Sequence, residues 1–291
     1  MPELPEVETL RRSLEPCLIG RTIARVDIRR RDMVVAPGDP AGGFSRSRGT
    51  ATPVRIKKSW LLKDMTIARL TRCGKQMAIE AGAGNQSCAP AVIVQLGMTG
   101  TVRSIDDPPA HTHVIWTLDN GLCIAFVDPR RFGVVRATPG GTEQAWADLG
   151  PDALTVRGAV LADRLARTSR PVKAALLDQA VVAGVGNIYA DEALFASRVH
   201  PQILACDLDR KTVGTLAGEI RRILRNAINH GGSTIKNYRD ADGKAGGYQA
   251  AHKVYGRDGL ECTRCGYRLT GLRVAQRATV FCPSCQVENH R

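Results

Sequence analysis

The period of the hydrophobic pattern changes once along the chain, and this change constrains the fold more than any other feature. From about residue 22 to residue 135, apolar and polar residues alternate, which is the pattern of half-buried strands. From about residue 158 to residue 230, apolar residues recur every three or four positions, as in helices. A chain of 291 residues usually forms more than one core. We therefore expect a strand-rich domain followed by a helical one.

A helix is expected before the strands, because Val7, Leu10 and Leu14 share one helical face and Pro5 suits a first turn. Gly20 would end it. Asp119-Asn120-Gly121 is a hairpin signal. The pattern predicts an antiparallel β sandwich or barrel fronted by one helix, in an α+β protein. The expected strands lie in 22–30, 61–70, 75–81, 91–105 and 113–128, and the expected helices are 158–167, 171–179, 187–197 and 207–232.

The net charge of +13, from 41 basic and 28 acidic residues, favours a polyanionic partner such as nucleic acid. Alternatively, the positive charge is that of an ordinary basic soluble enzyme with no nucleic-acid partner. No window approaches the roughly 18 apolar residues of a membrane helix. The charged N-terminus excludes a signal peptide, and five scattered cysteines suit a reducing compartment. We expect a cytoplasmic protein without a membrane partner.

Four further cysteines form the most specific local pattern. Two Cys-x2-Cys pairs, sixteen residues apart, offer four thiolates to one tetrahedral ion. Two disulfides are the alternative, and the expected reducing compartment disfavours them. The residues between the pairs alternate like a hairpin and carry three arginines, which suits phosphate contact. We expect one structural Zn²⁺ per chain, with the ligands Cys262, Cys265, Cys282 and Cys285.

Several turns could reach a nucleic acid, although each also has an ordinary structural reading. "DPRRFG" could project arginines and wedge Phe132 between bases, or Phe132 could be core. Met98 in "LGMTG" and Lys75 in "RCGKQ" could likewise be plain surface residues. The glycine turn before Asn187 could present helix N-terminal amides to a phosphate, or could be a packing corner.

Pro2 follows Met1 directly, so removal of the methionine would leave a secondary amine at the N-terminus. Such an amine has a lower pKa than a lysine side chain and can attack an aldehyde or a sugar C1′ carbon. Glu3 and Glu6 could move protons for it. Alternatively, Pro2 and Pro5 only start a helix whose dipole the glutamates complement. The residues alone favour this second reading.

Together, "PELPEVE", "LGMTG", "DPRRFG", "GVGNIYADE" and "AQRATVFCPSCQ" resemble the formamidopyrimidine-DNA glycosylase family over the whole chain. The resemblance implies a base excision repair enzyme of the bacterial cytoplasm and nucleoid, acting as a monomer on damaged double-stranded DNA. It would remove oxidised purines through an N-terminal proline Schiff base and cleave the strand by β,δ-elimination. It also implies a catalytic β-sandwich domain, a helix–two-turn–helix domain and a zinc finger, which we place at 1–138, 139–250 and 251–291.

The resemblance also implies individual roles. Pro2 would be the nucleophile and Glu3 the general acid and base. Lys75 would contact phosphate and assist elimination, and Arg277 would hold phosphates from the zinc hairpin. The residues expected to contact DNA are Met98, His111, Arg130, Phe132, Lys173 and Asn187, of which Met98, Arg130 and Phe132 would fill the gap left by the flipped nucleotide.

Two alternatives stay open at this point. The sister group resembling endonuclease VIII prefers oxidised pyrimidines, and Ala245 and Gly247 depart from the family pattern in the loop that closes over the base. Leu4 and the arginine–phenylalanine pair favour the purine-lesion group. A non-catalytic binder of damaged DNA is the other alternative, and the intact Pro2, Glu3 and Lys75 argue against it.

Overall fold

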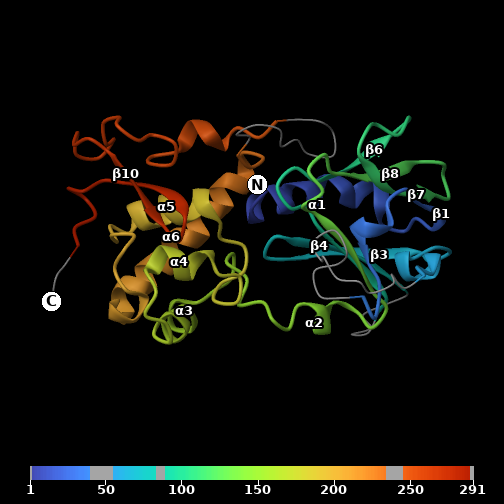
Figure 1. Cartoon of the computed structure of the whole chain (residues 1–291), viewed down its shortest axis with the longest axis horizontal. Helices are drawn as coiled ribbons and strands as arrows, with labels where there is room; N and C mark the ends of the chain where they lie inside the picture. Colours follow the sequence, from blue (N-terminus) through green and yellow to red (C-terminus); the bar gives the residue numbers. More distant parts are fainter. Residues whose placement is uncertain (1, 40–54, 83–88, 234–244, 289–291) are drawn as a thin grey trace. The chain divides into compact units, whose positions relative to one another are not determined.

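The computed structural model describes residues 2–39, 55–82, 89–233 and 245–288 (Figure 1). Its backbone divides into two compact units. The N-terminal unit comprises Met1–Asp148 and Gly231–Gly246, and the C-terminal unit comprises Leu149–His230 and Gly247–Arg291. In the described part of the chain, no helix has the length and apolar character to cross a membrane. The sequence is rich in Gly and Pro near 36–53 and 81–91, between the expected strands, and polar over 233–249. Most of each of these segments lies outside the described residues. The bounds of the three predicted domains stay predictions.

The leading helix of the N-terminal unit is α1, Leu4–Leu18. Glu3 is its N-cap, and Pro5 occupies its first turn, where a missing N–H costs nothing. Figure 1 shows α1 running alongside the strands of this unit. Leu10 and Leu14 are fully buried in the same core as those strands, which confirms the predicted helix and its apolar face.

Two sheets form the rest of the N-terminal unit. The first has the order β1-β7-β8-β6 and is antiparallel throughout. The second has the order β2-β9-β5-β4-β3. Trp116 and Phe126 from the first sheet share one core with Met77 and Val94 from the second, so the fold is the predicted sandwich. The strands are β1 Ile23–Ile28, β2 Val34–Val35, β3 Ile67–Cys73, β4 Gln76–Ala81, β5 Ala91–Gln95, β6 Thr101–Ile105, β7 Thr112–Leu118, β8 Cys123–Val127 and β9 Val134–Thr138.

The sheets differ from the sequence prediction in three places. β9 was not predicted, yet it lies between β2 and β5 inside its sheet. The short β2 pairs with β9 in parallel, because no hairpin sets the direction of strands so far apart in sequence. The start of the predicted strand 61–70 is not extended: a 3₁₀ turn, Lys58–Leu61, is followed by Leu62 and Asp64 at positive φ.

Helices dominate the C-terminal unit, as predicted. Asp209 caps the longest of them, since its side chain accepts a hydrogen bond from Thr212 N at 2.8 Å. A short helix, α2, Thr142–Ala145, precedes this unit in the chain. The helices of the unit are α3 Gly158–Leu165, α4 Val172–Leu177, α5 Asn187–Ala196 and α6 Arg210–Asn229, with 3₁₀ turns η3 Ala205–Asp207 and η4 Tyr248–Ala251.

A two-stranded hairpin completes the C-terminal unit. β10, Thr270–Val274, pairs with β11, Arg277–Phe281. Ala275 and Gln276 form the two-residue turn and both have positive φ, 48° and 61°. That is the geometry of a type I′ turn, whose twist matches the strands. The turn places Arg277 at the exposed tip of the hairpin.

Candidate active site and nucleic-acid interface

Pro2 lies buried one residue before the N-cap of α1. The helix-start reading is therefore correct for Pro5 but does not account for Pro2. Glu3 is 2% exposed, and its backbone N–H donates to Glu6 Oε2 at 2.7 Å. Glu6 Oε1 accepts the N–H of Ser233 at 2.7 Å. Glu6 thus fixes the backbone beside Pro2 and joins it to a segment more than two hundred residues away in sequence.

Lys75 lies in the two-residue turn between β3 and β4 and is half-buried. Arg72 secures this turn, because its guanidinium donates to Gly74 O and to Glu8 Oε2, both at 3.0 Å. Burial opposes ionisation of Glu8, but hydrogen bonds from Arg11 and neighbouring arginine charges outweigh it and lower its pKa to about 2. The Lys75 turn is therefore anchored to the helix that begins at the candidate nucleophile.

Two turns bring the predicted wedge residues together. Gly97, at φ +66°, packs against the backbone of Phe132 so closely that a Cβ atom would collide with it. Met98 and Phe132 are each 39% exposed, so both apolar side chains are accessible to a partner. The Arg130 guanidinium lies 4.6 Å from the centre of the Phe132 ring. The structure brings Met98, Arg130 and Phe132 to one place, as expected of residues that act together.

Asp128, which was not predicted as a site residue, organises these turns. Its side chain is fully buried and accepts hydrogen bonds from Gly133 N at 2.7 Å, Arg130 N at 3.2 Å and the Thr99 hydroxyl. Its backbone N–H donates to the carbonyl oxygen of His111 at 3.1 Å. The signal was present in the sequence, because Asp before Pro commonly bonds backbone groups that follow it in a turn.

His111 has φ +65° and an exposed side chain. Positive φ is uncommon for residues other than glycine, although histidine adopts it more readily than most. The hydrogen bond from Asp128 N holds this conformation. Met98, His111, Arg130 and Phe132 therefore all lie on turns that Asp128 supports, whereas Lys75 lies on the turn that Arg72 secures.

Lys173 is fully buried in the C-terminal unit, although an exposed residue was expected from its predicted contact with DNA. Its ammonium donates to Thr279 Oγ1 at 2.7 Å and Ala278 O at 2.9 Å, and pairs with Asp191 at 2.7 Å. Burial raises the pKa of Asp191 to about 6 against the lowering effect of Lys173. In this structure Lys173 supports the zinc hairpin, and its contact with DNA stays a prediction.

Asn187 holds the same hairpin. Its amide donates to Ala278 O at 2.9 Å. Two side chains from α4 and α5 therefore converge on the carbonyl oxygen that directly follows Arg277. This arrangement fixes β11 and leaves the guanidinium of Arg277 exposed for a partner.

The four predicted zinc ligands meet at one point. Their Sγ atoms all lie within 4.8 Å of one another. Four sulfurs bound at 2.3 Å to a tetrahedral zinc ion would be about 3.8 Å apart, so the site fits. Cys265 Sγ and Cys282 Sγ are 3.6 Å apart, too far for a disulfide. This centre binds one structural Zn²⁺, and its ligands belong to the core that contains Val254 and Leu269.

These features define a class of protein: a β sandwich with a buried N-terminal proline, followed by a helical unit that carries a zinc-bound hairpin. Comparison with known families gives three matches that follow this order. Residues 1–135 match the formamidopyrimidine-DNA glycosylase N-terminal domain, residues 149–239 its H2TH domain, and residues 259–287 the zinc finger found in FPG and IleRS.

Full-length relatives identify the family. The chain is 38% identical to a formamidopyrimidine-DNA glycosylase of Shewanella pealeana, over 98% of this chain and 99% of that protein. The Bacillus subtilis enzyme is 37% identical, over 99% and 100%. The MutM (Fpg) structure from Thermus thermophilus matches with a TM-score of 0.81 at 36% identity, over 99% and 100%. The chain belongs to the formamidopyrimidine-DNA glycosylase family.

Proposed function

We propose that this protein is a bifunctional DNA glycosylase and AP lyase that removes oxidised purines from duplex DNA. Its relatives carry the glycosylase name, and a solved structure of the Lactococcus lactis Fpg, 31% identical with a TM-score of 0.81, holds DNA with an abasic site. The observation that carries the proposal is that Pro2 and Glu3 are both buried directly before α1. The Glu6 carboxylate holds the backbone of this pair in place by accepting the Glu3 N–H.

In the proposed reaction, removal of Met1 frees the Pro2 nitrogen, which attacks C1′ of the damaged nucleoside. The N–C1′ bond forms as the glycosidic bond breaks, and Glu3 transfers the protons needed for base release and opening of the sugar ring. The resulting iminium cation acidifies the C2′ hydrogen. Loss of that proton breaks the C3′–O bond, and a second elimination breaks the C5′–O bond.

The remaining site residues would bind and distort the substrate. A base within duplex DNA is inaccessible, so the nucleotide must leave the stack. Met98, Arg130 and Phe132 would fill the space it vacates, with Arg130 facing the opposite base. Lys75, His111, Asn187 and Arg277 would contact phosphates around the lesion, and Lys173 would act with them. The zinc ion performs no step, and its four ligands hold the hairpin that carries Arg277.

The test is covalent trapping with borohydride on duplexes that contain 8-oxoguanine, a formamidopyrimidine or thymine glycol. We expect trapping and strand cleavage with the purine lesions. A variant with one extra residue retained ahead of Pro2 should still bind duplex DNA but form no adduct, because its proline nitrogen is an amide. Pro5→Ala is the matched control and should be trapped. Full trapping of the extended variant would refute Pro2 as the nucleophile, and preference for thymine glycol would favour an endonuclease VIII-like specificity.

A further inference from the structure

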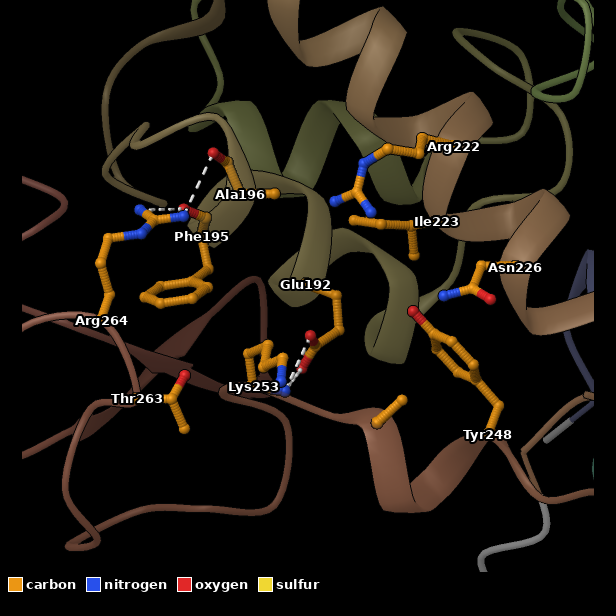
Figure 2. A pocket seen from close by; sticks show the side chains of 11 residues that line it. Glu192, Phe195, Ala196, Arg222, Ile223, Asn226, Tyr248, Lys253, Thr263 and Arg264 are labelled. Carbon is orange, nitrogen blue, oxygen red and sulfur yellow. Dashed lines mark hydrogen bonds between the residues drawn. The ribbon is translucent and has the colours of Figure 1, made fainter.

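A cavity of about 530 Å³ lies within the C-terminal unit, apart from every residue assigned above (Figure 2). Its walls come from α5, α6, η4 and the first turn of the zinc module. This volume is in the range of sites for small ligands.

Tyr248 is the most informative residue of this cavity. It is 4% exposed, and Figure 2 shows its hydroxyl pointing into the space between α5 and α6. Its hydroxyl has no hydrogen-bond partner within the described residues. Burial, followed by the nearby charge of Glu192, raises the pKa of Tyr248 to about 12, so the hydroxyl is a hydrogen-bond donor at neutral pH. Because the hydroxyl faces the cavity, it is available to donate to an oxygen atom of a bound ligand.

The groups around this hydroxyl are mainly donors as well. Arg222 faces it, and the amide of Asn226 lies on the same side of the cavity (Figure 2). Arg222 already donates to Glu219 at 2.6 Å, but its guanidinium has further N–H groups. On the opposite side, Arg264 lies 4.3 Å from the centre of the Phe195 ring.

One carboxylate lines the cavity, and backbone N–H groups already bond to it. Glu192 accepts the N–H groups of Lys253, Val254 and Tyr255 at 2.9–3.0 Å. Its oxygens are therefore engaged and do not compete for a ligand's donors. With Lys253 and the two arginines against Glu192 and Glu219, the cavity has an excess of positive charge.

We propose that this cavity binds a small organic anion. Its phosphate or carboxylate oxygens would accept hydrogen bonds from Tyr248, Asn226 and Arg222. Its flat apolar body would pack toward Phe195 and Ala196. Guanidinium groups and a tyrosine hydroxyl suit such oxyanions, and the ring of Phe195 suits the apolar body.

The test uses the zinc-loaded full-length protein and two probes, phenyl phosphate and benzoate, with phenol as the neutral control. Binding is followed by ligand-detected NMR, and ligands of this size are expected to have a Kd in the millimolar range. Tyr248→Phe should weaken binding of the preferred anion about tenfold, as expected for loss of a hydrogen bond to a charged group. Arg222→Gln should weaken it at least as much.

Two control variants make the same types of substitution outside the cavity. Tyr267→Phe alters an exposed tyrosine, and Arg210→Gln alters an exposed α6 arginine that, like Arg222, pairs with a carboxylate. Both should bind the probe as the unmodified protein does. Zinc content and thermal unfolding verify that each variant is folded.

The outcomes separate this site from the proposed DNA interface. Binding of either anion that undamaged duplex DNA does not displace supports the proposal, and the preferred probe identifies the oxyanion. Four results overturn the proposal. The first is that neither anion binds at a probe concentration about ten times the expected Kd, and the second is that phenol binds as tightly as the anions. The third is that Tyr248→Phe binds the preferred anion with unchanged affinity, and the fourth is that duplex DNA displaces the bound anion. None of these results depends on whether the protein excises a base.

Discussion

Replacement of Asp128 by asparagine tests how the wedge residues are positioned. One oxygen of the buried carboxylate accepts Gly133 N–H, and the other accepts Arg130 N–H and the Thr99 hydroxyl. Asparagine keeps the shape but has a single acceptor oxygen, so its amide group must face at least one of these donors. Loss of one hydrogen bond to a buried charged acceptor costs about 1.5–3 kcal/mol. We therefore expect Asp128→Asn to lower the free energy of unfolding of the N-terminal unit by about 2–3 kcal/mol.

All three tryptophans, Trp60, Trp116 and Trp146, lie in the N-terminal unit, so tryptophan fluorescence during urea unfolding follows that unit alone. The same variant should excise a lesion more slowly in single-turnover experiments while binding undamaged duplex DNA almost normally. The physical reason is that Met98, Arg130 and Phe132 would lose their fixed positions, whereas phosphate contacts elsewhere would persist.

Two variants serve as controls for this prediction. Thr99→Val removes one donor and leaves the shared oxygen bonded to Arg130 N–H, so it should cost about 1 kcal/mol. Asp119→Asn changes an aspartate on an exposed hairpin and should change stability by less than about 0.5 kcal/mol. If Asp128→Asn matches Asp119→Asn in both unfolding and excision, Asp128 does not organise the site.

Three further predictions concern other parts of the chain. Because the pKa of Glu8 is about 2 in the folded protein and near 4.5 otherwise, its stabilisation is complete above pH 4.5 and is lost as the pH falls toward 2. After solvent screening this amounts to about 1–2 kcal/mol, and Glu8→Gln should remove that pH dependence from acid unfolding curves. Cys282→Ser should abolish zinc binding, measured by metal analysis, and weaken DNA affinity without shifting the tryptophan unfolding curve. Arg130→Ala should reduce the difference in binding free energy between duplexes with cytosine and with adenine opposite 8-oxoguanine, by roughly 1–3 kcal/mol. Arg277→Ala should instead weaken binding to both duplexes alike, and should reduce by about one the slope of log affinity against log salt concentration.

Features that depend on local sequence were predictable here. The spacing of the four cysteines was sufficient to predict the metal centre, because a Cys-x2-Cys turn positions both sulfurs by itself. The hydrophobic period was sufficient to predict the helices and a β sandwich or barrel, and the family resemblance implied the sandwich. β9 was missed because five residues beside a Pro-Gly-Gly turn give little periodic signal, and its place in the sheet comes from pairing with β5.

Features that depend on contacts between distant segments were not predictable. The environment of Lys173 is set by residues about 105 positions later in the chain, so nothing near it indicated burial. The role of Asp128 likewise requires the turn at Thr99 to meet the turn at Gly133. The family resemblance named the residues on these turns, but only the structure shows which buried group supports them.

The supports of the two candidate DNA-binding arginines are separate. Arg130 depends on Asp128, whose partners all lie between residues 97 and 133 of the N-terminal unit. Arg277 depends on a hairpin that Lys173 and Asn187 hold at Ala278 and that zinc holds at Cys282. Loss of zinc should therefore affect the grip on phosphates and leave the wedge residues in place, and loss of the Asp128 carboxylate should do the reverse. In the proposed function, opposite-base discrimination and phosphate binding therefore depend on two separate supports, which single substitutions can test one at a time.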